Sequence, residues 1–356
     1  MTIQYFKDVE RHSLKFSKLQ RVYSSPIIIF ENGVKLYLFY LAIIKQMTLG
    51  TAQATNSSIN RFVTYISRLI RESSDLYQNY TFINDYENFI NLPDEISEGV
   101  LLDPQLERGL VFKNVWFKYQ SAPDWNLRNL SFTIKPTENI AIVGENGAGK
   151  TTLIKLICRF YQPQKGEIFL NGRNIYEYDL VSYRRAISAL FQDFAQYPFS
   201  AKDNIHFGDI KKKLRLKEIK KVARYTDMHH FIDKLPRKYS NPLDKEFASG
   251  IEPSKGQWQR IALSRTLYRD AHIVILDEPT SNVDPESEEK IFASVMEIDK
   301  DKMIFLVSHR FSTVRKADKI LVIENGELVE EGKHADLIKK RGRYHELFTL
   351  QAQNYQ

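Results

Sequence analysis

A glycine-rich segment followed by a lysine and two threonines is the strongest chemical signal in the sequence. The segment Gly144–Thr152 reads GENGAGKTT and satisfies the pattern G-x-x-x-x-G-K-[ST]. It follows the apolar run Ile140–Val143 and precedes a helix-like segment. In this strand–loop–helix context, backbone N–H groups and a helix N-terminus point at an anion. We therefore predict a triphosphate site in which Lys150 lies between the β- and γ-phosphates and Thr151 offers its hydroxyl to Mg²⁺. The predicted nucleotide contacts of this loop are Gly144, Glu145, Asn146, Gly147, Ala148, Gly149, Lys150, Thr151 and Thr152.

Four further polar residues follow three apolar runs of the kind that form buried strands. Asp277 and Glu278 end the run Ile273–Leu276, at the position where α/β sheets bind ligands. Asp277 is suited to hold the water shell of Mg²⁺, and Glu278 to polarise the attacking water as a general base. His309 follows a second run and would hydrogen-bond the γ-phosphate and that water. Gln192 follows a third, and its side-chain oxygen would bind Mg²⁺.

The segments around these residues predict an α/β domain. Strand-like runs occur at 110–119, 127–134, 140–144, 273–279 and 303–309, and a hairpin signal occurs at 166–172. Helices are expected at Lys150–Tyr161, Tyr183–Phe191, Gly256–Tyr268 and Glu286–Glu297. No internal repeat of 20–50 residues is found.

Taken together, the motifs and their order resemble the ATP-binding cassette (ABC) family of transport ATPases from about Leu110 to the C-terminus. The resemblance implies an α/β P-loop NTPase fold with an antiparallel β subdomain and a helical subdomain. By the same resemblance Tyr119 stacks on adenine, Gln192 is the Q-loop glutamine, Asp284 belongs to the D-loop Ser281–Asp284, and Glu278 and His309 are catalytic. The implied cofactors are ATP and Mg²⁺, and the expected magnesium ligands are Thr151, Gln192 and Asp277.

The family signature Leu-Ser-Gly-Gly-Gln corresponds here to Pro253-Ser-Lys-Gly-Gln257. In the family this segment reaches the nucleotide of the opposing subunit, which assigns Ser254, Lys255, Gly256 and Gln257 to a site shared between two chains. Lys255 adds a positive charge that would either strengthen phosphate binding or obstruct closure of the dimer. The expected partner is a second ABC subunit, in a homodimer or with a related half-transporter.

The first hundred residues differ from the rest of the chain in their composition and in their pattern of apolar residues. Pro26–Ile44 is the most apolar window, interrupted by Glu31 and Lys35, and is compatible with a buried or interfacial helix or with a membrane span. Apolar residues at three- and four-residue steps then predict a long amphipathic helix that ends at Asn91–Pro93. This part resembles the last membrane helices of an ABC exporter subunit and their cytoplasmic extension.

The resulting domain prediction is a truncated all-α membrane-type segment at 1–100, with spans at 26–46 and 51–73, a linker at 101–108 and an ABC domain at 109–356. The resemblance places the protein in the plasma membrane with its ATPase domain on the cytoplasmic face, and further membrane helices would come from a separate chain. The two charges in the first span fit either a polar pathway or a poorly hydrophobic helix in an incomplete domain.

Composition limits the other possibilities. The 356 residues include 51 basic and 44 acidic side chains, for a net charge of +7 spread along the chain, which favours solubility over nucleic-acid binding. The single cysteine, Cys158, excludes an internal disulfide framework and a multi-cysteine zinc site. A mean hydropathy of −0.39 excludes a chain made mostly of membrane helices, and the N-terminus lacks a signal peptide.

The function expected from these features is ATP hydrolysis coupled to export of a substrate that the sequence does not identify. Two alternatives stay open at this point. One is a truncated module that binds ATP and partners but transports nothing by itself. The other is a soluble ABC-type ATPase acting on nucleic acid, which the lack of tandem cassettes and long heptads disfavours.

Overall fold

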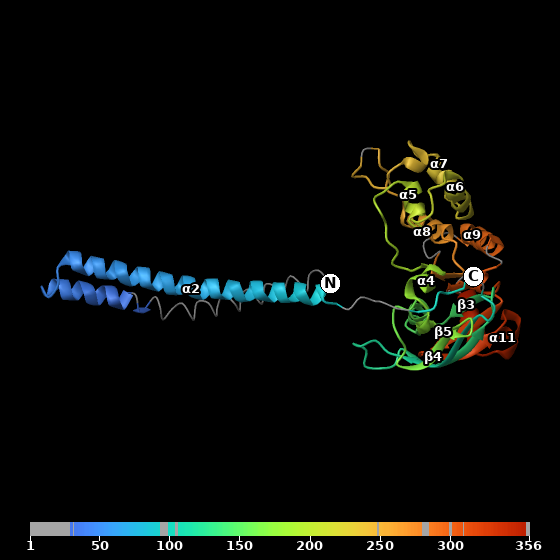
Figure 1. The fold of residues 1–356 in the computed structure, drawn as a ribbon, viewed down its shortest axis with the longest axis horizontal. Helices are drawn as coiled ribbons and strands as arrows, with labels where there is room; N and C mark the ends of the chain where they lie inside the picture. The colour runs from blue at the N-terminus through green and yellow to red at the C-terminus, as the bar shows by residue number, and fades with distance from the viewer. Residues whose placement is uncertain are drawn as a thin grey trace. The chain divides into compact units, whose positions relative to one another are not determined.

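The computed structural model describes residues 29–30, 32–92, 99–103, 106–247, 249–279, 285–298, 301–308 and 310–353. It divides the chain into two compact units, Met1–Asp94 and Glu95–Gln356, which we call the N-terminal unit and the C-terminal unit (Figure 1). Each is described by itself.

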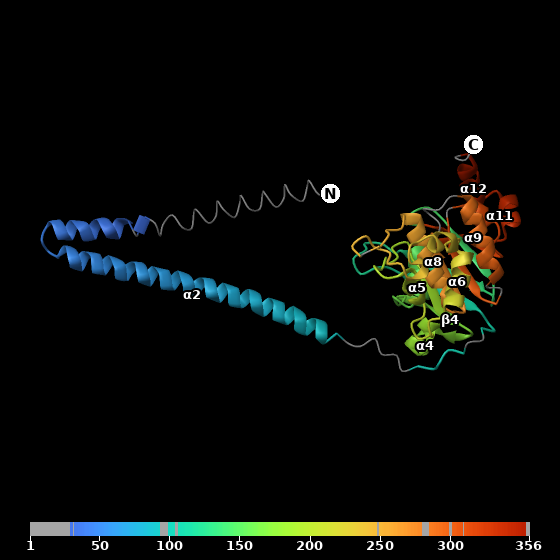
Figure 2. The ribbon, with the colours of Figure 1, turned by 90° about the horizontal axis from the view of Figure 1, so that it is seen from above.

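The described part of the N-terminal unit is a helical hairpin. Residues 32–43 are helical, the chain turns back, and the first part of α2 (Leu49–Ile90), a helix of 42 residues, runs beside them (Figure 2). Thr48 caps α2 by accepting a hydrogen bond from the N–H of Thr51, and Leu38 and Ala52 are buried. The predicted long helix is confirmed, although most of its large apolar side chains are exposed. Across the described residues, the length and the apolar character needed to cross a membrane do not occur together in any helix.

A six-stranded sheet forms the centre of the C-terminal unit. Its order is β10 (Glu327–Gly332), β9 (Lys319–Glu324), β3 (Asn139–Val143), β8 (Met303–Val307), β7 (Ile273–Asp277) and β6 (Ile187–Leu190). All neighbours are parallel except β10, which pairs antiparallel with β9. Because the carboxyl ends of the five parallel strands lie at one edge, polar residues that follow different strands are brought to the same place.

Alternating side chains give the central sheet two buried faces. Along β3, Ile140 and Ile142 belong to one apolar cluster, whereas Ala141 and Val143 belong to another. The strands β7 and β8 alternate in the same way between the first cluster and a third. This explains why these strands read as continuous apolar runs in the sequence. The strands predicted at 140–144, 273–279 and 303–309 are confirmed.

One face of the central sheet is covered by α3 (Lys150–Ile157) and by a second, antiparallel sheet. That sheet has the order β2 (Leu127–Ile134), β1 (Leu110–Phe117), β4 (Lys165–Leu170) and β5 (Arg173–Asn174). Its buried side chains and those of α3 share the first apolar cluster with β3, β7 and β8. The antiparallel β subdomain is therefore confirmed.

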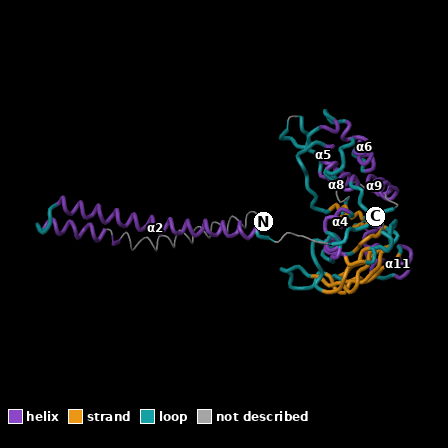
Figure 3. The backbone as a smooth tube through the Cα atoms, in the orientation of Figure 1, coloured by secondary structure: helices purple, strands orange, loops and turns teal. Residues whose placement is uncertain are grey.

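The other face is packed by helices, and a helical subdomain extends from it (Figure 3). The subdomain contains α5 (Ala201–His206), α6 (Leu216–Tyr225), α7 (His229–Asp233), η2 (Lys238–Ser240) and α8 (Lys255–Tyr268), with an apolar cluster of its own. The remaining elements are η1 (Ile175–Glu177), α4 (Leu180–Arg185), α9 (Pro285–Ile298), α10 (Phe311–Val314), α11 (His334–Lys340) and α12 (Arg343–Gln353).

The helix predicted at Tyr183–Phe191 is wrong. Helix α4 ends at Arg185, and Ile187–Leu190 forms β6, which pairs in parallel with β7. The Ala186 carbonyl accepts the N–H groups of His272 and Ile273 at 3.0 and 2.9 Å, which starts this pairing. A four-residue apolar run is too short for its periodicity to separate helix from strand, so the long-range pairing decides its conformation.

The segment expected as a linker is hydrogen-bonded to the C-terminal unit. The Leu102 N–H donates to the Ser182 hydroxyl at 3.2 Å, and the N–H groups of Glu107 and Arg108 both donate to Asn171 Oδ1 at 2.9 Å. The ordered C-terminal unit thus begins before the first strand of the antiparallel sheet.

Substitution of Ile275 by Ala should destabilise the C-terminal unit. Ile275 is fully buried in β7, so its truncation leaves a cavity and should lower the free energy of unfolding by about 2–5 kcal/mol. Urea unfolding followed by tryptophan fluorescence measures the change. Val181→Ala is the control, since Val181 is 64% exposed and its loss should cost no more than about 0.5 kcal/mol. Equal effects of the two substitutions would contradict the assignment of the core.

Candidate functional site

The glycine-rich loop has a positive φ at Gly144, Gly147 and Gly149, and at the first and last of these a side chain would also clash. Gly144 and Gly149 have φ values of +155° and +106°. A Cβ at Gly144 would lie 2.1 Å from the Ile323 carbonyl oxygen, and one at Gly149 would lie 2.7 Å from the Leu127 side chain. Gly149 is also the N-cap of α3 and has no side chain to accept the first helical N–H groups. These donors are therefore left for an anion.

Lys150 lies inside the loop that precedes it. The side chain is 7% exposed, and its Nζ donates to the carbonyls of Gly144 and Glu145 at 2.8 and 2.7 Å. Burial lowers the pKa of Lys150, while the carboxylates of Glu278, Asp277 and Glu145 act in the opposite direction. The ammonium is thus held at the centre of the loop among groups of opposite charge.

Thr151 and Asp277, both predicted as magnesium ligands, are brought together. The Thr151 hydroxyl donates to Asp277 Oδ2 at 3.0 Å, and Asp277 is only 3% exposed at the end of β7. Burial raises the pKa of Asp277 above its ordinary value of 3.8, although the Thr151 hydrogen bond opposes this. A hydroxyl and a desolvated carboxylate are hard oxygen donors, and they fit Mg²⁺ in type.

Glu278 has an unusual backbone conformation and is hydrogen-bonded to two other segments. Its φ is +50°, a left-handed value that costs about 1–3 kcal/mol for a residue other than glycine. Its backbone N–H donates to the Val307 carbonyl of β8 at 3.0 Å, and its Oε2 accepts from the Gln192 side chain at 3.2 Å. The predicted base and the Q-loop glutamine therefore lie next to each other.

Gln259 of α8 is a residue that the sequence analysis missed. Its side chain is 2% exposed and donates to the Glu278 carbonyl at 2.8 Å. It connects the helix of the signature segment to the residue proposed as base. A signal was present, since an amide on the buried face of a helix needs a polar partner.

Tyr119 lies beside α3 on the side of the antiparallel sheet. Its hydroxyl is 3.3 Å from the Thr152 hydroxyl, and its ring meets Phe117 and Tyr161 edge-on, at centroid distances of 5.0 and 5.1 Å. The aromatic residue expected to stack on adenine is therefore next to the helix that begins at the loop.

The signature residues form the N-terminus of α8. Ser254 is the N-cap and accepts from the Gln257 N–H at 3.3 Å, while Gln257 Oε1 accepts from the Ser254 N–H at 2.8 Å. This capping box fixes the start of the helix. Ser254 and Lys255 are exposed and Gly256 is partly exposed, so all three are accessible to another molecule.

Two predicted residues, His309 and Asp284, lie outside the described residues. Two described residues nearby in the sequence form an ion pair that the sequence analysis missed. Arg310, the neighbour of His309 in the sequence, pairs with Glu288 of α9. The side chain of Glu288 is 1% exposed. Removing one partner of a buried pair is costly, so this contact ties the segment after β8 to α9.

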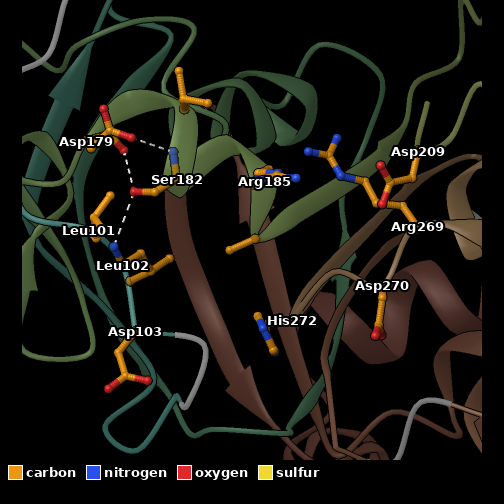
Figure 4. Close-up of a pocket in the computed structure, with 12 residues that line it drawn as sticks. Leu101, Leu102, Asp103, Asp179, Ser182, Arg185, Asp209, Arg269, Asp270 and His272 are labelled. Carbon is orange, nitrogen blue, oxygen red and sulfur yellow. Dashed lines mark hydrogen bonds between the residues drawn. The ribbon is translucent and has the colours of Figure 1, made fainter. Parts of the chain in front are cut away.

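A cavity of about 450 Å³ lies away from these residues (Figure 4). Ala186 and His272, which line it, directly precede β6 and β7, so the cavity is at the amino ends of these strands. Asp179, Ser182 and Leu102 form hydrogen bonds along one wall (Figure 4). The cavity contains none of the predicted site residues.

Asp277→Asn should stabilise the chain in the absence of nucleotide and metal. Because the folded pKa of Asp277 is raised, the ionised carboxylate disfavours the folded state at neutral pH, and this effect disappears as the pH falls through that pKa. The urea midpoint of the variant should exceed that of the wild type at neutral pH, and the difference should shrink on acidification.

Asp301→Asn is the control for this experiment. Asp301 is exposed, so the same change of charge there should leave the midpoint difference small at every pH. A neutral-pH midpoint of Asp277→Asn below the wild-type value would contradict the burial penalty assigned to Asp277.

Comparison with known proteins supports the interpretation of the fold. Residues 127–281 match the family model described as ABC transporter. The chain is 32% identical over 322 residues to the subtilin transport ATP-binding protein SpaT of Bacillus subtilis, covering 88% of this chain and 52% of SpaT. It is 31% identical over 349 residues to an ATP-dependent lipid A-core flippase of Pasteurella multocida, covering 97% of this chain and 59% of the flippase.

A solved structure gives the same result. A bacterial Atm1-family ABC exporter with ATP bound matches 99% of this chain and 64% of its own, with a TM-score of 0.72 and 26% identity. The chain therefore spans about half to two thirds of the length of these proteins. The motif order, the arrangement of the loop and carboxylates at one sheet edge, and these matches lead to one conclusion: this chain carries a domain of the ABC transporter family.

Proposed function

We propose that the chain binds and hydrolyses MgATP as a subunit of an ABC-type exporter. The observation that carries the proposal is the meeting of Lys150, Thr151, Asp277 and Glu278 at one edge of the central sheet. Binding alone requires the loop and Lys150. Hydrolysis also requires a base, and we assign this role to Glu278, whose charge acts on both Lys150 and Asp277.

Each residue of this site has a separate role in the proposed reaction. Lys150 and the open N-terminus of α3 hold the phosphates, and Tyr119 takes the adenine. Thr151, Asp277 and Gln192 would hold Mg²⁺, which supplies charge for the phosphates when it is bound. Glu278 accepts a proton from the attacking water. Gln192 and Gln259 fix the position of Glu278 by hydrogen bonds to its carboxylate and its carbonyl.

The proposal includes a second ABC subunit. Ser254, Lys255, Gly256 and Gln257 are presented at the exposed start of α8, and each ATP would lie between the loop of one chain and this segment of the other. Asp284 and His309 would complete the shared site. A homodimer is the simplest assembly because every element occurs once in this chain.

Export is proposed from the names and lengths of the relatives. SpaT is named for subtilin transport and the flippase for lipid A-core, and the match to each includes part of the N-terminal unit. Helix α2 has 42 residues and is about 63 Å long at 1.5 Å per residue, twice the thickness of a bilayer core. This length supports a membrane-associated segment at 51–73 followed by an extension outside the bilayer. We place the ATPase domain on the cytoplasmic face of the plasma membrane.

Glu278→Gln tests the role of the base. The variant keeps the shape of the side chain but cannot accept a proton, so the ATPase rate should fall by about 10²–10⁴-fold while MgATP is still bound. Phosphate release and equilibrium binding of ATP measure the two effects. Lys150→Ala is the contrasting variant and should lose binding itself. Undiminished phosphate release by Glu278→Gln would remove Glu278 from the proposed role.

A mixing experiment tests the shared site. Lys150→Ala and Ser254→Ala chains should each be inactive as homodimers, but a mixed dimer has one intact loop facing one intact signature. Random pairing of equal amounts should restore about a quarter of the wild-type sites, because half the dimers are mixed and each has one complete site. Mixing either variant with itself is the control. Activity no higher in the mixture than in the controls would contradict a site shared between two of these chains.

A further inference from the structure

Arg343 connects the C-terminal helix to the glycine-rich loop. It is the first residue of α12, and its guanidinium contacts three carboxylates. Nη2 lies 2.5 Å from Glu145 Oε1, Nε lies 2.8 Å from Glu324 Oε1, and Nη1 lies 3.0 Å from Glu346 Oε2. Glu145 is the second residue of the loop and is 198 residues away in the sequence.

Helix α12 is firmly docked, so the position of the guanidinium is well defined. Tyr344, the next residue, is fully buried, and its N–H donates to Glu330 Oε2 at 2.8 Å. Further along the helix, Gln351 Oε1 accepts from the Phe311 N–H at 3.1 Å. The arginine is therefore presented by a helix that is fixed at both ends.

The carboxylate of Glu145 is a difficulty for a loop that binds phosphates. It is negatively charged like the triphosphate, and it belongs to a residue that Lys150 contacts directly. The Glu145 carbonyl already accepts a hydrogen bond from Lys150 Nζ at 2.7 Å, so the ammonium is close to this residue. A carboxylate that turned toward Lys150 would compete with phosphate for the same cation.

We propose that Arg343 is a positioning residue of the nucleotide site: it holds the Glu145 carboxylate away from Lys150 and neutralises it. The C-terminal helix is then part of the ATP site although it contributes no atom to the phosphate cradle. This inference rests on the proposed function of the loop and concerns how strongly the loop binds ATP.

A double-mutant cycle on the full chain tests the inference. In Arg343→Ala the Kd for ATP, measured by displacement of a fluorescent ATP analogue, should rise about two- to fivefold, the range expected for charges at a partly exposed site. The kcat should change little. In Arg343→Ala/Glu145→Gln the carboxylate is gone, and the Kd should return toward the wild-type value. Arg343→Lys should retain part of the effect because it keeps the charge.

Salt and two control variants separate this effect from a structural one. The difference in Kd between wild type and Arg343→Ala should shrink as ionic strength rises, since screening weakens exposed charge interactions. Lys340→Ala removes an exposed charge from the neighbouring helix α11 and should leave the Kd unchanged. Glu324→Gln removes a different partner of Arg343 and should lower thermal stability without weakening ATP binding.

The outcomes distinguish this inference from the proposed function. Suppose that the wild type binds ATP. If the Kd of Arg343→Ala then equals the wild-type Kd, or if it is raised but the added Glu145→Gln does not restore it, the positioning role is overturned and the nucleotide site stands. Should Arg343→Ala fail to fold, the comparison of Arg343→Lys with Arg343→Lys/Glu145→Gln decides in the same way. Lack of ATP binding by the wild type itself would overturn both proposals.

Discussion

The placement of opposite charges at a partly desolvated sheet edge is the constraint on which the rest of the structure depends. Lys150 and Asp277 are almost completely buried. Burial lowers the pKa of Lys150 and raises that of Asp277, so it favours the neutral form of each side chain. Such groups are tolerated only where other charges and hydrogen bonds compensate for lost water. Here the carbonyls of Gly144 and Glu145 satisfy the lysine and the Thr151 hydroxyl satisfies the aspartate. The site is thus preorganised at a cost in stability that the apolar clusters must offset.

The apolar clusters do more than supply stability. Because β3, β7 and β8 are buried on both faces, their ends cannot shift without disturbing two packed layers. This rigidity fixes where Gly144, Glu278 and the segment after β8 begin. It also accounts for the left-handed conformation of Glu278, since its backbone donates a hydrogen bond to β8 and accepts one from α8, which leaves it little alternative. Strain at that residue is therefore imposed by the fold around it.

How far the sequence predicts this structure depends on whether a feature is local. The strands that end in Val143 and Asp277 and the loop between Gly144 and Thr152 are predicted correctly, because their pattern and motif lie within ten residues. The strand β6 is mistaken for part of a helix, because its conformation depends on pairing with β7, more than eighty residues later. The contacts of Gln259 and Arg343 have no local pattern either. A polar residue on a helix gives no indication of which distant carbonyl or carboxylate it will meet.

The same distinction bears on how the nucleotide site is controlled. The motif residues are those proposed to carry the chemistry, but several of the groups that contact them or their neighbours come from α8, α9 and α12, which carry none of the phosphate-loop pattern. Each of these helices contacts one residue of the site or its neighbour through a single hydrogen bond or ion pair. A shift of α8 would move Glu278, a shift of α9 would move Arg310, and a shift of α12 would move Glu145. Because α8 and α12 reach different residues, they can act on different properties of the site. Displacement of α8 would alter the position of the base and thus the rate of hydrolysis, whereas displacement of α12 would alter the charge around Lys150 and thus the affinity for ATP.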